Sequence, residues 1–102
     1  DINPNSYGHT LCILKKEIDY IFDLSDEEYL SLMNFSKRVA LAINKSVDCK
    51  RVAMSVVGLE VPHVHVHLIP INNMNDLNFS NNLELEKITF EQVCNKIKSN
   101  LD

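Results

Sequence analysis

The chain has few of the residues that mark special classes of protein. Its 102 residues include no tryptophan, two glycines and three prolines, and acidic residues outnumber basic ones, which leaves a net charge of −4. Without a basic surplus there is no general positive field for nucleic acid, so a phosphate ligand has to be held by local groups. No apolar run approaches the roughly 20 residues that a membrane-spanning helix needs. We therefore expect neither nucleic acid nor a membrane as a partner.

Cysteine is also scarce, and its placement is informative. Cys12, Cys49 and Cys94 are far apart and odd in number. This spacing matches neither a disulfide framework nor a zinc knuckle, and it is typical of free thiols in a reducing compartment. We therefore expect a cytoplasmic protein. A chain of this length, with 45% hydrophobic residues, suffices for one core and is too short for two, so we expect a single domain over residues 1–102.

The remaining patterns predict an α+β domain. A strand is expected at residues 9–14, and Ser25 followed by three acidic residues predicts the capped beginning of an amphipathic helix that runs to about Lys45. Further strands are expected at residues 51–57 and 61–69, close enough to form an antiparallel hairpin. Residues 72–82 are polar and loop-like, and Thr89 is expected to cap a short final helix. These elements predict an antiparallel sheet with one long helix against it.

Three histidines alternate with valines in the third predicted strand. His63, His65 and His67 are separated by Val64 and Val66. Successive side chains of a strand point to opposite faces, so the three rings are expected on one face, each about 6.6 Å from the next. Three polar rings in a row need hydrogen-bond or charge partners, which a core strand does not supply. We therefore predict a functional site at these histidines.

Imidazole is well suited to chemistry at phosphorus. A neutral ring can attack phosphorus when a second group fixes its tautomer, and neighbouring imidazolium and hydroxyl groups can stabilise the developing negative charge. His9, on a neighbouring predicted strand, adds a fourth imidazole. Histidines spaced in this way also fit zinc or iron ligands, and His9 taken alone is more typical of a buried, hydrogen-bonded histidine. The residues themselves leave these alternatives open.

Two segments carry a resemblance to a known family. Residues 63–69, His-Val-His-Val-His-Leu-Ile, resemble the signature of the histidine triad (HIT) superfamily, in which histidines alternate with apolar residues. Residues 1–11 are similar to the family's Asp-φ-x-Pro-x-x-x-Gly-His-x-φ segment, where φ is apolar, and this segment contains His9. The resemblance extends to Pro70 and implies the HIT fold, paired as a two-fold homodimer. The helix and hairpin that usually precede these segments in the family have no counterpart in the chain.

The resemblance also implies roles for particular residues. His65 is expected to be the nucleophile that takes the nucleotidyl group, His67 to contact the phosphate, and His63 and His9 to support them. In the family, the residue at Asp1 hydrogen-bonds the ribose. The implied catalytic set is His65, His67, His63 and His9, and the implied nucleotide-binding set is Asp1, Ile2, Ser55, Gly58, Leu59, Glu60, His65 and His67.

Two positions depart from the pattern of the nucleoside phosphoramidase branch. Ser55 falls where relatives have an asparagine, and the glycine-rich loop before the triad is shortened to residues 58–62. Glu60 falls at the family's small hydroxyl position. A carboxylate there repels a phosphate, and it either favours an amine leaving group or points to solvent.

The expected protein is therefore a nucleotide-binding hydrolase or transferase that acts at the α-phosphate of a purine nucleotide conjugate. A nucleoside phosphoramidate or a dinucleoside polyphosphate is the expected substrate, and a nucleotidyl-histidine the expected intermediate. We expect no cofactor and no metal, because no Asp, Glu or Cys lies at complementary spacing near the triad. The alternatives are a nucleotide-binding regulatory module with little turnover and a histidine-ligated metalloprotein.

Overall fold

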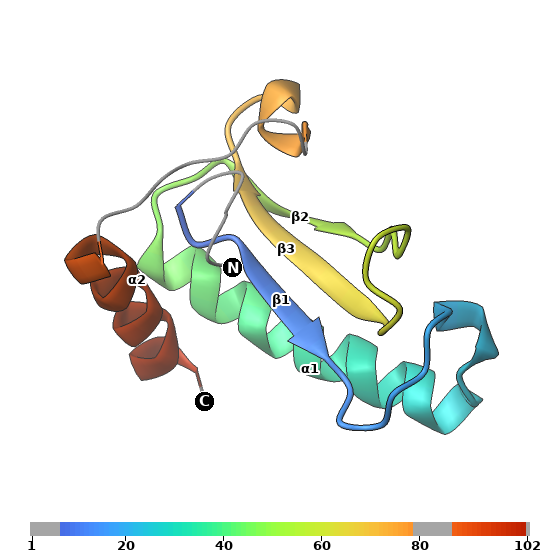
Figure 1. The fold of residues 1–102 in the computed structure, drawn as a ribbon. Helices are drawn as coiled ribbons and strands as arrows, with labels where there is room; N and C mark the ends of the chain where they lie inside the picture. The colour runs from blue at the N-terminus through green and yellow to red at the C-terminus, as the bar shows by residue number, and fades with distance from the viewer. Residues whose placement is uncertain (1–6, 79–86, 102) are drawn as a thin grey trace.

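The protein folds as a small antiparallel sheet with a long helix against one face (Figure 1). The computed structural model describes residues 7–78 and 87–101. The elements in chain order are β1 (Thr10–Ile13), η1 (Ile21–Asp23), α1 (Asp26–Ser46), β2 (Arg51–Ser55), β3 (His65–Ile71), η2 (Met74–Leu77) and α2 (Lys87–Asn100). The predicted α+β class is confirmed. No helix in these two ranges is long and apolar enough to cross a membrane.

β3 lies at the centre of the sheet, in the order β1-β3-β2, and both neighbours pair with it in antiparallel orientation. The predicted hairpin of β2 and β3 is thereby confirmed. Val64, Val66 and Leu68 are each at most 1% exposed, and they share the core with Leu32 and Ile43 of α1. The apolar positions of the histidine segment therefore hold the sheet against the long helix.

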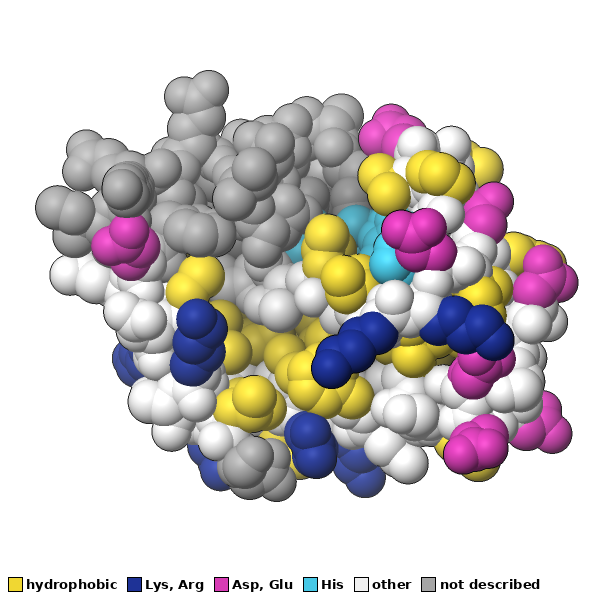
Figure 2. Space-filling view, turned by 60° about the horizontal axis from the view of Figure 1, so that its bottom comes forward, with side chains coloured by type: hydrophobic (Ala, Val, Ile, Leu, Met, Phe, Trp, Pro, Cys, Tyr) yellow, Lys and Arg dark blue, Asp and Glu magenta, His cyan; other side chains and the backbone are white. Residues whose placement is uncertain are grey.

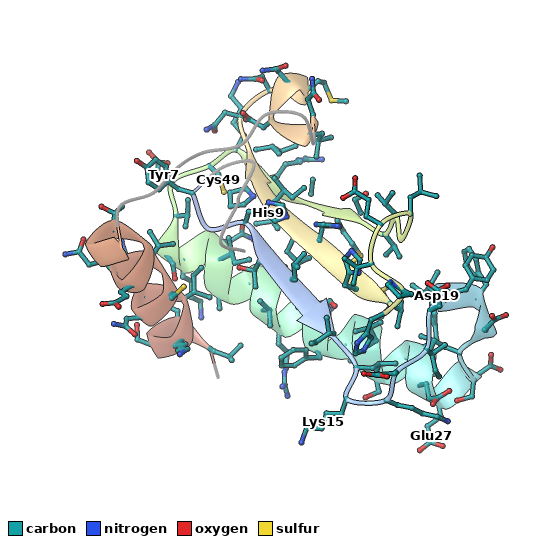
Figure 3. All side chains as sticks on the ribbon, viewed as in Figure 1. Tyr7, His9, Lys15, Asp19, Glu27 and Cys49 are labelled. Carbon is teal, nitrogen blue, oxygen red and sulfur yellow. The ribbon has the colours of Figure 1, made fainter. Side chains whose placement is uncertain are left out.

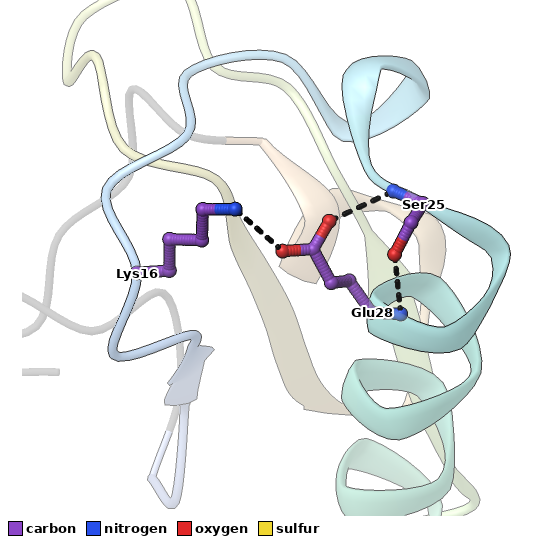
Figure 4. A network of polar contacts seen from close by, with 3 residues as sticks. All are labelled: Lys16, Ser25 and Glu28. Atoms are coloured by element: carbon purple, nitrogen blue, oxygen red, sulfur yellow. Dashed lines mark hydrogen bonds and ion pairs between the residues drawn. The ribbon is translucent and has the colours of Figure 1, made fainter.

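The beginning of α1 matches the prediction. The Glu28 backbone N–H donates to Ser25 Oγ at 3.1 Å, and the Ser25 backbone N–H donates to Glu28 Oε1 at 2.8 Å. Lys16 Nζ lies 3.3 Å from the other carboxylate oxygen (Figure 4). These contacts satisfy backbone donors that the first turn leaves unpaired and hold the Glu28 pKa below its usual value. The helix ends at Ser46, one residue beyond the expected end.

The C-terminal helix α2 packs beside α1 (Figure 1). Ser46 Oγ donates to the Lys96 carbonyl oxygen at 3.1 Å and accepts a 2.9 Å hydrogen bond from Asn100 Nδ2. The expected cap at Thr89 is wrong, because the helix already begins at Lys87. No glycine or proline lies between Lys87 and Thr89, so the sequence does not interrupt the helix there.

The predicted strand boundaries were less accurate. β1 and β2 are shorter than expected, and β3 covers His65–Ile71 instead of residues 61–69. Strand pairing explains the different bounds of β3. β1 pairs with β3 from His65 to Leu68, and β2 pairs with it from His67 to Ile71. Beyond Leu68, β3 has a described strand on one side only, which is where Pro70, lacking an N–H, is tolerated.

The predicted loop at residues 72–82 contains a short helix. η2 begins after Asn73, whose side chain accepts from the Asn75 backbone N–H at 3.0 Å, and Asp76 accepts from the backbone of Asn72 at 2.8 Å. Side chains that favour loops by bonding to nearby backbone also cap such short helical turns. The last part of the predicted loop, residues 79–82, lies outside the described residues.

Candidate active site

The candidate site lies on the face of the sheet opposite α1. Directly paired residues of antiparallel strands share a face, and the register pairs His67 with Leu11 and Ser55 and pairs His65 with Ile13. The alternate positions, such as Cys12 and Val66, belong to the core. Figure 3 shows the side chains on the sheet, with His9 labelled near the beginning of β1.

His9 and His67 form a direct imidazole pair. Nε2 of His9 lies 3.0 Å from Nδ1 of His67, and His9 is only 3% exposed. Burial lowers the pKa of each ring to about 4, with a further contribution from His67 in the case of His9 and from His65 in the case of His67. Both rings are therefore neutral at pH 7, so one of the two nitrogens donates a proton and the other accepts it.

The tautomer of His65 follows from its hydrogen bond. Nδ1 of His65 lies 2.7 Å from the carbonyl oxygen of His63. A carbonyl oxygen can only accept, so Nδ1 must donate, and the neutral ring then carries its lone pair on Nε2. The ring of His65 packs edge-to-face against that of His67, with centroids 4.8 Å apart. This geometry suits His65 to nucleophilic attack.

His63 is placed differently from the prediction. It precedes β3, and its backbone N–H donates to the Val61 carbonyl oxygen at 2.9 Å in a tight turn. Its ring Nε2 donates to the carbonyl oxygen of Leu14 at 2.8 Å, just past the end of β1. The expected regular strand spacing is therefore wrong for this histidine, because the turn at Val61 removes it from the sheet.

The other predicted site residues have different surroundings. Ser55 is half-buried on the histidine face and directly opposite His67. Gly58, Leu59 and Glu60 lie in the loop between β2 and β3, where Gly58 has a φ of +77° and Leu59 is 89% exposed. Glu60 is exposed. The structure thus places Ser55 opposite His67, whose ring contacts those of His9 and His65. The predictions for Asp1 and Ile2 fall outside the described residues.

A cleft beside His65 was missed by the sequence analysis. It encloses about 300 Å³ between η1 and the loop that follows β2, and its wall includes Asp19, Tyr20, Phe22, Val57, Leu59 and His65. The one sequence feature that could have indicated this cleft is the pair of aromatic residues Tyr20 and Phe22. They lie shortly before Ser25, in a stretch without helical or strand periodicity. Only the fold shows that this stretch lies beside the histidines.

One ring nitrogen of each of the four histidines takes part in a hydrogen bond. His63 Nε2, His65 Nδ1 and the facing nitrogens of His9 and His67 all have partners at 3.0 Å or less. Within residues 7–78 and 87–101, no three His, Cys, Asp or Glu side chains are grouped so that they could hold a metal ion.

Comparison with known proteins identifies relatives of this chain. The profile of the HIT domain matches residues 1–74. An uncharacterized HIT-like protein of Methanocaldococcus jannaschii is 34% identical over 69% of this chain and 57% of its own length. The adenosine 5'-monophosphoramidase of Saccharomyces cerevisiae is 37% identical over 69% of this chain and 45% of its own. An asymmetrical bis(5'-nucleosyl)-tetraphosphatase of Schizosaccharomyces pombe is 31% identical over 85% of this chain and 51% of its own.

The chain thus spans about half the length of these three relatives. Solved structures share its fold over nearly the whole chain. A hypothetical histidine triad nucleotide-binding protein from Sulfolobus tokodaii has a TM-score of 0.81 at 27% identity, covering 99% of this chain and 74% of that one. A zinc-bound histidine triad family protein from Mycobacterium smegmatis has a TM-score of 0.78 at 23% identity, covering 99% and 73%.

Proposed function

The chain belongs to the HIT domain family, and from this premise we propose that it is a nucleotide hydrolase or transferase acting at the α-phosphate of a purine nucleotide conjugate. Two fungal relatives support this proposal by their names, a monophosphoramidase and a tetraphosphatase. In both substrate classes a nucleotide phosphate is joined to a second group, a nitrogen or a further phosphate. The proposed chemistry replaces that group with water in two steps.

The observation that carries the proposal is the hydrogen bond from His65 Nδ1 to the His63 carbonyl oxygen. It leaves the lone pair on Nε2, which attacks phosphorus and forms a nitrogen–phosphorus bond. The bond to the leaving group breaks, and the leaving atom departs with the electron pair and takes a proton from water. A water molecule then attacks phosphorus, the bond to Nε2 breaks, and the proton lost by that water passes to solvent. His65 is regenerated with its Nδ1 proton still in place.

The pairing of His67 with His9 supports a phosphate-binding role for His67. A neutral imidazole contacts a phosphate oxygen best when the nitrogen facing it carries the proton. If His67 Nε2 carries that proton, Nδ1 must accept, and the 3.0 Å contact is then a hydrogen bond donated by His9 Nε2. His9 therefore acts as a positioning residue that selects the tautomer of His67. Ser55, directly opposite His67, adds a hydroxyl donor on the same face.

The nucleoside is proposed to lie beyond the His9–His67 pair. The family resemblance assigns its ribose to Asp1 and its base to Ile2, and the backbone of the loop at Gly58 and Glu60 completes the nucleotide site. We further propose that residues 1–102 act as one HIT domain, and that the protein is cytoplasmic, since its three cysteines are free thiols.

Trapping the intermediate tests this function. The protein is mixed with adenosine 5'-phosphoramidate, quenched within one turnover, digested and mapped by mass spectrometry. We expect an adenylyl group on the peptide that contains His65 and none in His65→Asn. Nucleotide binding without an adduct or product would contradict catalysis and favour a regulatory nucleotide-binding module.

Metal analysis of the same sample tests the remaining alternative. The mechanism requires a free lone pair on His65, which a bound metal would occupy. We therefore expect well under one metal ion per chain and unchanged activity after exhaustive chelation. Stoichiometric zinc that is lost from the His63, His65 or His67 variants would favour a metalloprotein.

A further inference from the structure

We propose that Lys16 and Glu28 are positioning residues for His65. Their ion pair holds residues 14–18 against the beginning of β3, and this segment in turn holds the peptide group whose carbonyl fixes the tautomer of His65. This inference rests on the proposed function, in which Nε2 of His65 attacks phosphorus. It adds to that function two residues that act on the nucleophile through the backbone.

The carbonyl group that holds His65 belongs to a peptide group with a second hydrogen bond. This peptide group joins His63 to Val64, and its C=O and N–H point in opposite directions because the peptide bond is planar and trans. The His63 carbonyl oxygen accepts from Nδ1 of His65 at 2.7 Å. The Val64 backbone N–H donates to the carbonyl oxygen of Ile18, also at 2.7 Å. The bond to Ile18 therefore sets the direction in which the His63 carbonyl points.

The two hydrogen bonds also strengthen each other. Hydrogen bonds that are joined through one peptide group polarise it, so the bond to Ile18 makes the His63 carbonyl oxygen a better acceptor. The Nδ1 proton of His65 is then held more firmly, and the lone pair stays on Nε2, where the proposed mechanism needs it. Val64 is 1% exposed, so water has little access to this peptide group.

Residues 14–18 contact the beginning of β3 at two points. Besides the bond to Ile18, the carbonyl oxygen of Leu14 accepts from Nε2 of His63 at 2.8 Å. The flanks of the segment are attached to the core, since Leu14 packs against it and Ile21 of η1 is 7% exposed. Residues 15–20 are all described and belong to no helix or strand. The position of the Ile18 carbonyl therefore depends on what holds the middle of the segment.

Lys16 attaches the middle of the segment to α1. Its Nζ lies 3.3 Å from a carboxylate oxygen of Glu28, in the first turn of the helix (Figure 4). Glu28 is itself held, because its other carboxylate oxygen accepts from the Ser25 backbone N–H at 2.8 Å. The capped beginning of α1 is thus connected through Lys16 to the segment that orients His65.

The exposure of the ion pair determines the size of the expected effect. The side chains of Lys16 and Glu28 are 71% and 26% exposed. Figure 2 shows acidic and basic side chains next to one another on the surface near the histidines. Ion pairs at such a surface are weak, because water and salt screen them. We therefore expect loss of the pair to slow the attack of His65 about threefold and not to abolish it.

Three substitutions separate the ion pair from the other contacts of the two residues. Lys16→Met removes the charge and keeps a long side chain, and Lys16→Arg keeps the charge. Glu28→Gln removes the pair but retains an oxygen that can accept from the Ser25 backbone N–H, as glutamine does in the same capping motif. With saturating adenosine 5'-phosphoramidate, Lys16→Met and Glu28→Gln should each lower the single-turnover rate of adduct formation about threefold. Neither should change the affinity for AMP, and Lys16→Arg should keep the wild-type rate.

A double substitution tests whether Lys16 and Glu28 act as a pair. Lys16→Met combined with Glu28→Gln should slow adduct formation no further than either change alone, because both remove the same interaction. Lys15→Met is the matched control, since Lys15 is exposed and points away from the sheet in Figure 3. It should leave the rate unchanged. Losses that multiply in the double variant would contradict the pair.

Nuclear magnetic resonance reads the tautomer of His65 directly. At about pH 8, above the usual pKa of histidine, the nitrogen shifts of the ring distinguish the protonated nitrogen from the one with the lone pair. Wild type and Lys15→Met should carry the proton on Nδ1. Lys16→Met and Glu28→Gln should show a mixture of tautomers and faster hydrogen exchange of the Val64 amide. Since only the Nδ1-protonated ring can attack, its fraction should match the fraction of the rate that remains.

The outcomes distinguish a failure of the positioning role from a failure of the proposed function. An unchanged tautomer in Lys16→Met and Glu28→Gln would overturn the positioning role and leave the proposed function intact. The same holds for weaker AMP binding with an unchanged rate of adduct formation. Absence of an adduct in the wild-type protein would overturn the proposed function, and the inference with it.

Discussion

At the scale of single residues, backbone carbonyls determine what the histidines can do. The His63 carbonyl oxygen holds the Nδ1 proton of His65, and the Leu14 carbonyl oxygen holds the ring of His63. The orientation of His65 therefore depends on the backbone of His63, whereas the ring of His63 contacts the backbone of Leu14. A substitution removes the ring of a histidine and keeps its backbone carbonyl, so the histidine substitutions are expected to have different effects.

Substitution of the histidines should produce three different outcomes. His65→Asn should abolish turnover and leave AMP binding largely intact, because a nucleophile acts in the covalent step. His67→Ala should impair both binding and turnover, since it is assigned to the phosphate. His63→Ala should cause a smaller loss than His65→Asn, because the carbonyl that orients His65 remains. Steady-state kinetics and AMP titration check these expectations, and near-native turnover by His65→Asn would contradict the assignment of the nucleophile.

The pair of His9 and His67 should make stability depend on pH. The pKa values of His9 and His67 are lowered to about 4, below the value of 6.5 that an exposed histidine has. The unfolded chain therefore binds more protons than the folded chain between these values. The stabilisation is fully present above pH 6.5 and is lost as the pH falls through this window.

Thermal unfolding between pH 7 and 5 measures this effect. We expect the melting temperature to fall over this range, and to fall less in His9→Gln, in which one of the two shifted groups is absent. The carboxylate of Glu28, whose pKa is lowered by the Ser25 backbone N–H, contributes at lower pH and does not interfere. Parallel curves for the two proteins would show that His9 does not carry a shifted pKa.

At the scale of elements, the turn before β1 positions His9. Gly8 has a φ of +85°, and a Cβ added there would lie 2.8 Å from Val47 Cγ2 and 3.3 Å from Pro70 Cγ. The chain therefore enters β1 by passing closely between the end of α1 and β3. Glycine is needed at Gly8 for its backbone conformation and for the close approach of its neighbours.

A pair of glycine substitutions separates these two requirements. Gly58→Ala changes a residue with a φ of +77° and nothing within 4 Å of the added Cβ, so it should cost only the conformational strain, about 1 kcal/mol. Gly8→Ala adds the steric conflict with Val47 and should cost about 2–3 kcal/mol. Chemical denaturation gives both free energies of unfolding. Equal costs would show that the neighbours of Gly8 yield without strain.

At the scale of the whole molecule, the described sheet is small and its histidine face carries apolar side chains. Leu11 and Ile13, on that face of β1, are 39% and 56% exposed. Within the described residues β1 and β2 are the two edges of the sheet, so each has one side unpaired. These features, together with the family resemblance, lead us to expect a two-fold homodimer in which the sheet extends across the interface, close to the nucleotide sites.

Sedimentation at micromolar concentration tests this assembly. We expect a dimer, and we expect a version preceded by the family's N-terminal helix and hairpin to be more stable and to bind the nucleotide base more tightly. The comparison needs AMP titration of both proteins. A monodisperse monomer would contradict the assembly, and equal affinities would show that the added segment does not build the base pocket.

The sequence by itself determined the fold class, the long capped helix, the β2–β3 hairpin and the family. The physical reason is that these features depend on local chemistry: the Ser25 and Glu28 side chains bond to backbone three residues away, and alternation along a strand assigns Val66 to the core. The sequence also indicated a functional site at His65 and His67, because their alternation with valines is a local pattern. The chemical roles of these histidines remain predictions that the experiments above test.

Tertiary structure alone decided which hydrogen bonds the histidines make and what surrounds them. The partner of the His67 ring is 58 residues away in the chain, and that of His63 is 49 residues away. The end of a strand also depends on where the neighbouring strand stops, and the local sequence does not show this. For this reason the sequence did not predict that His63 lies outside β3. The cleft at Tyr20 and Phe22 was not predictable for this reason: it exists only because two loops, separated in sequence by the whole of α1, meet at the beginning of β3.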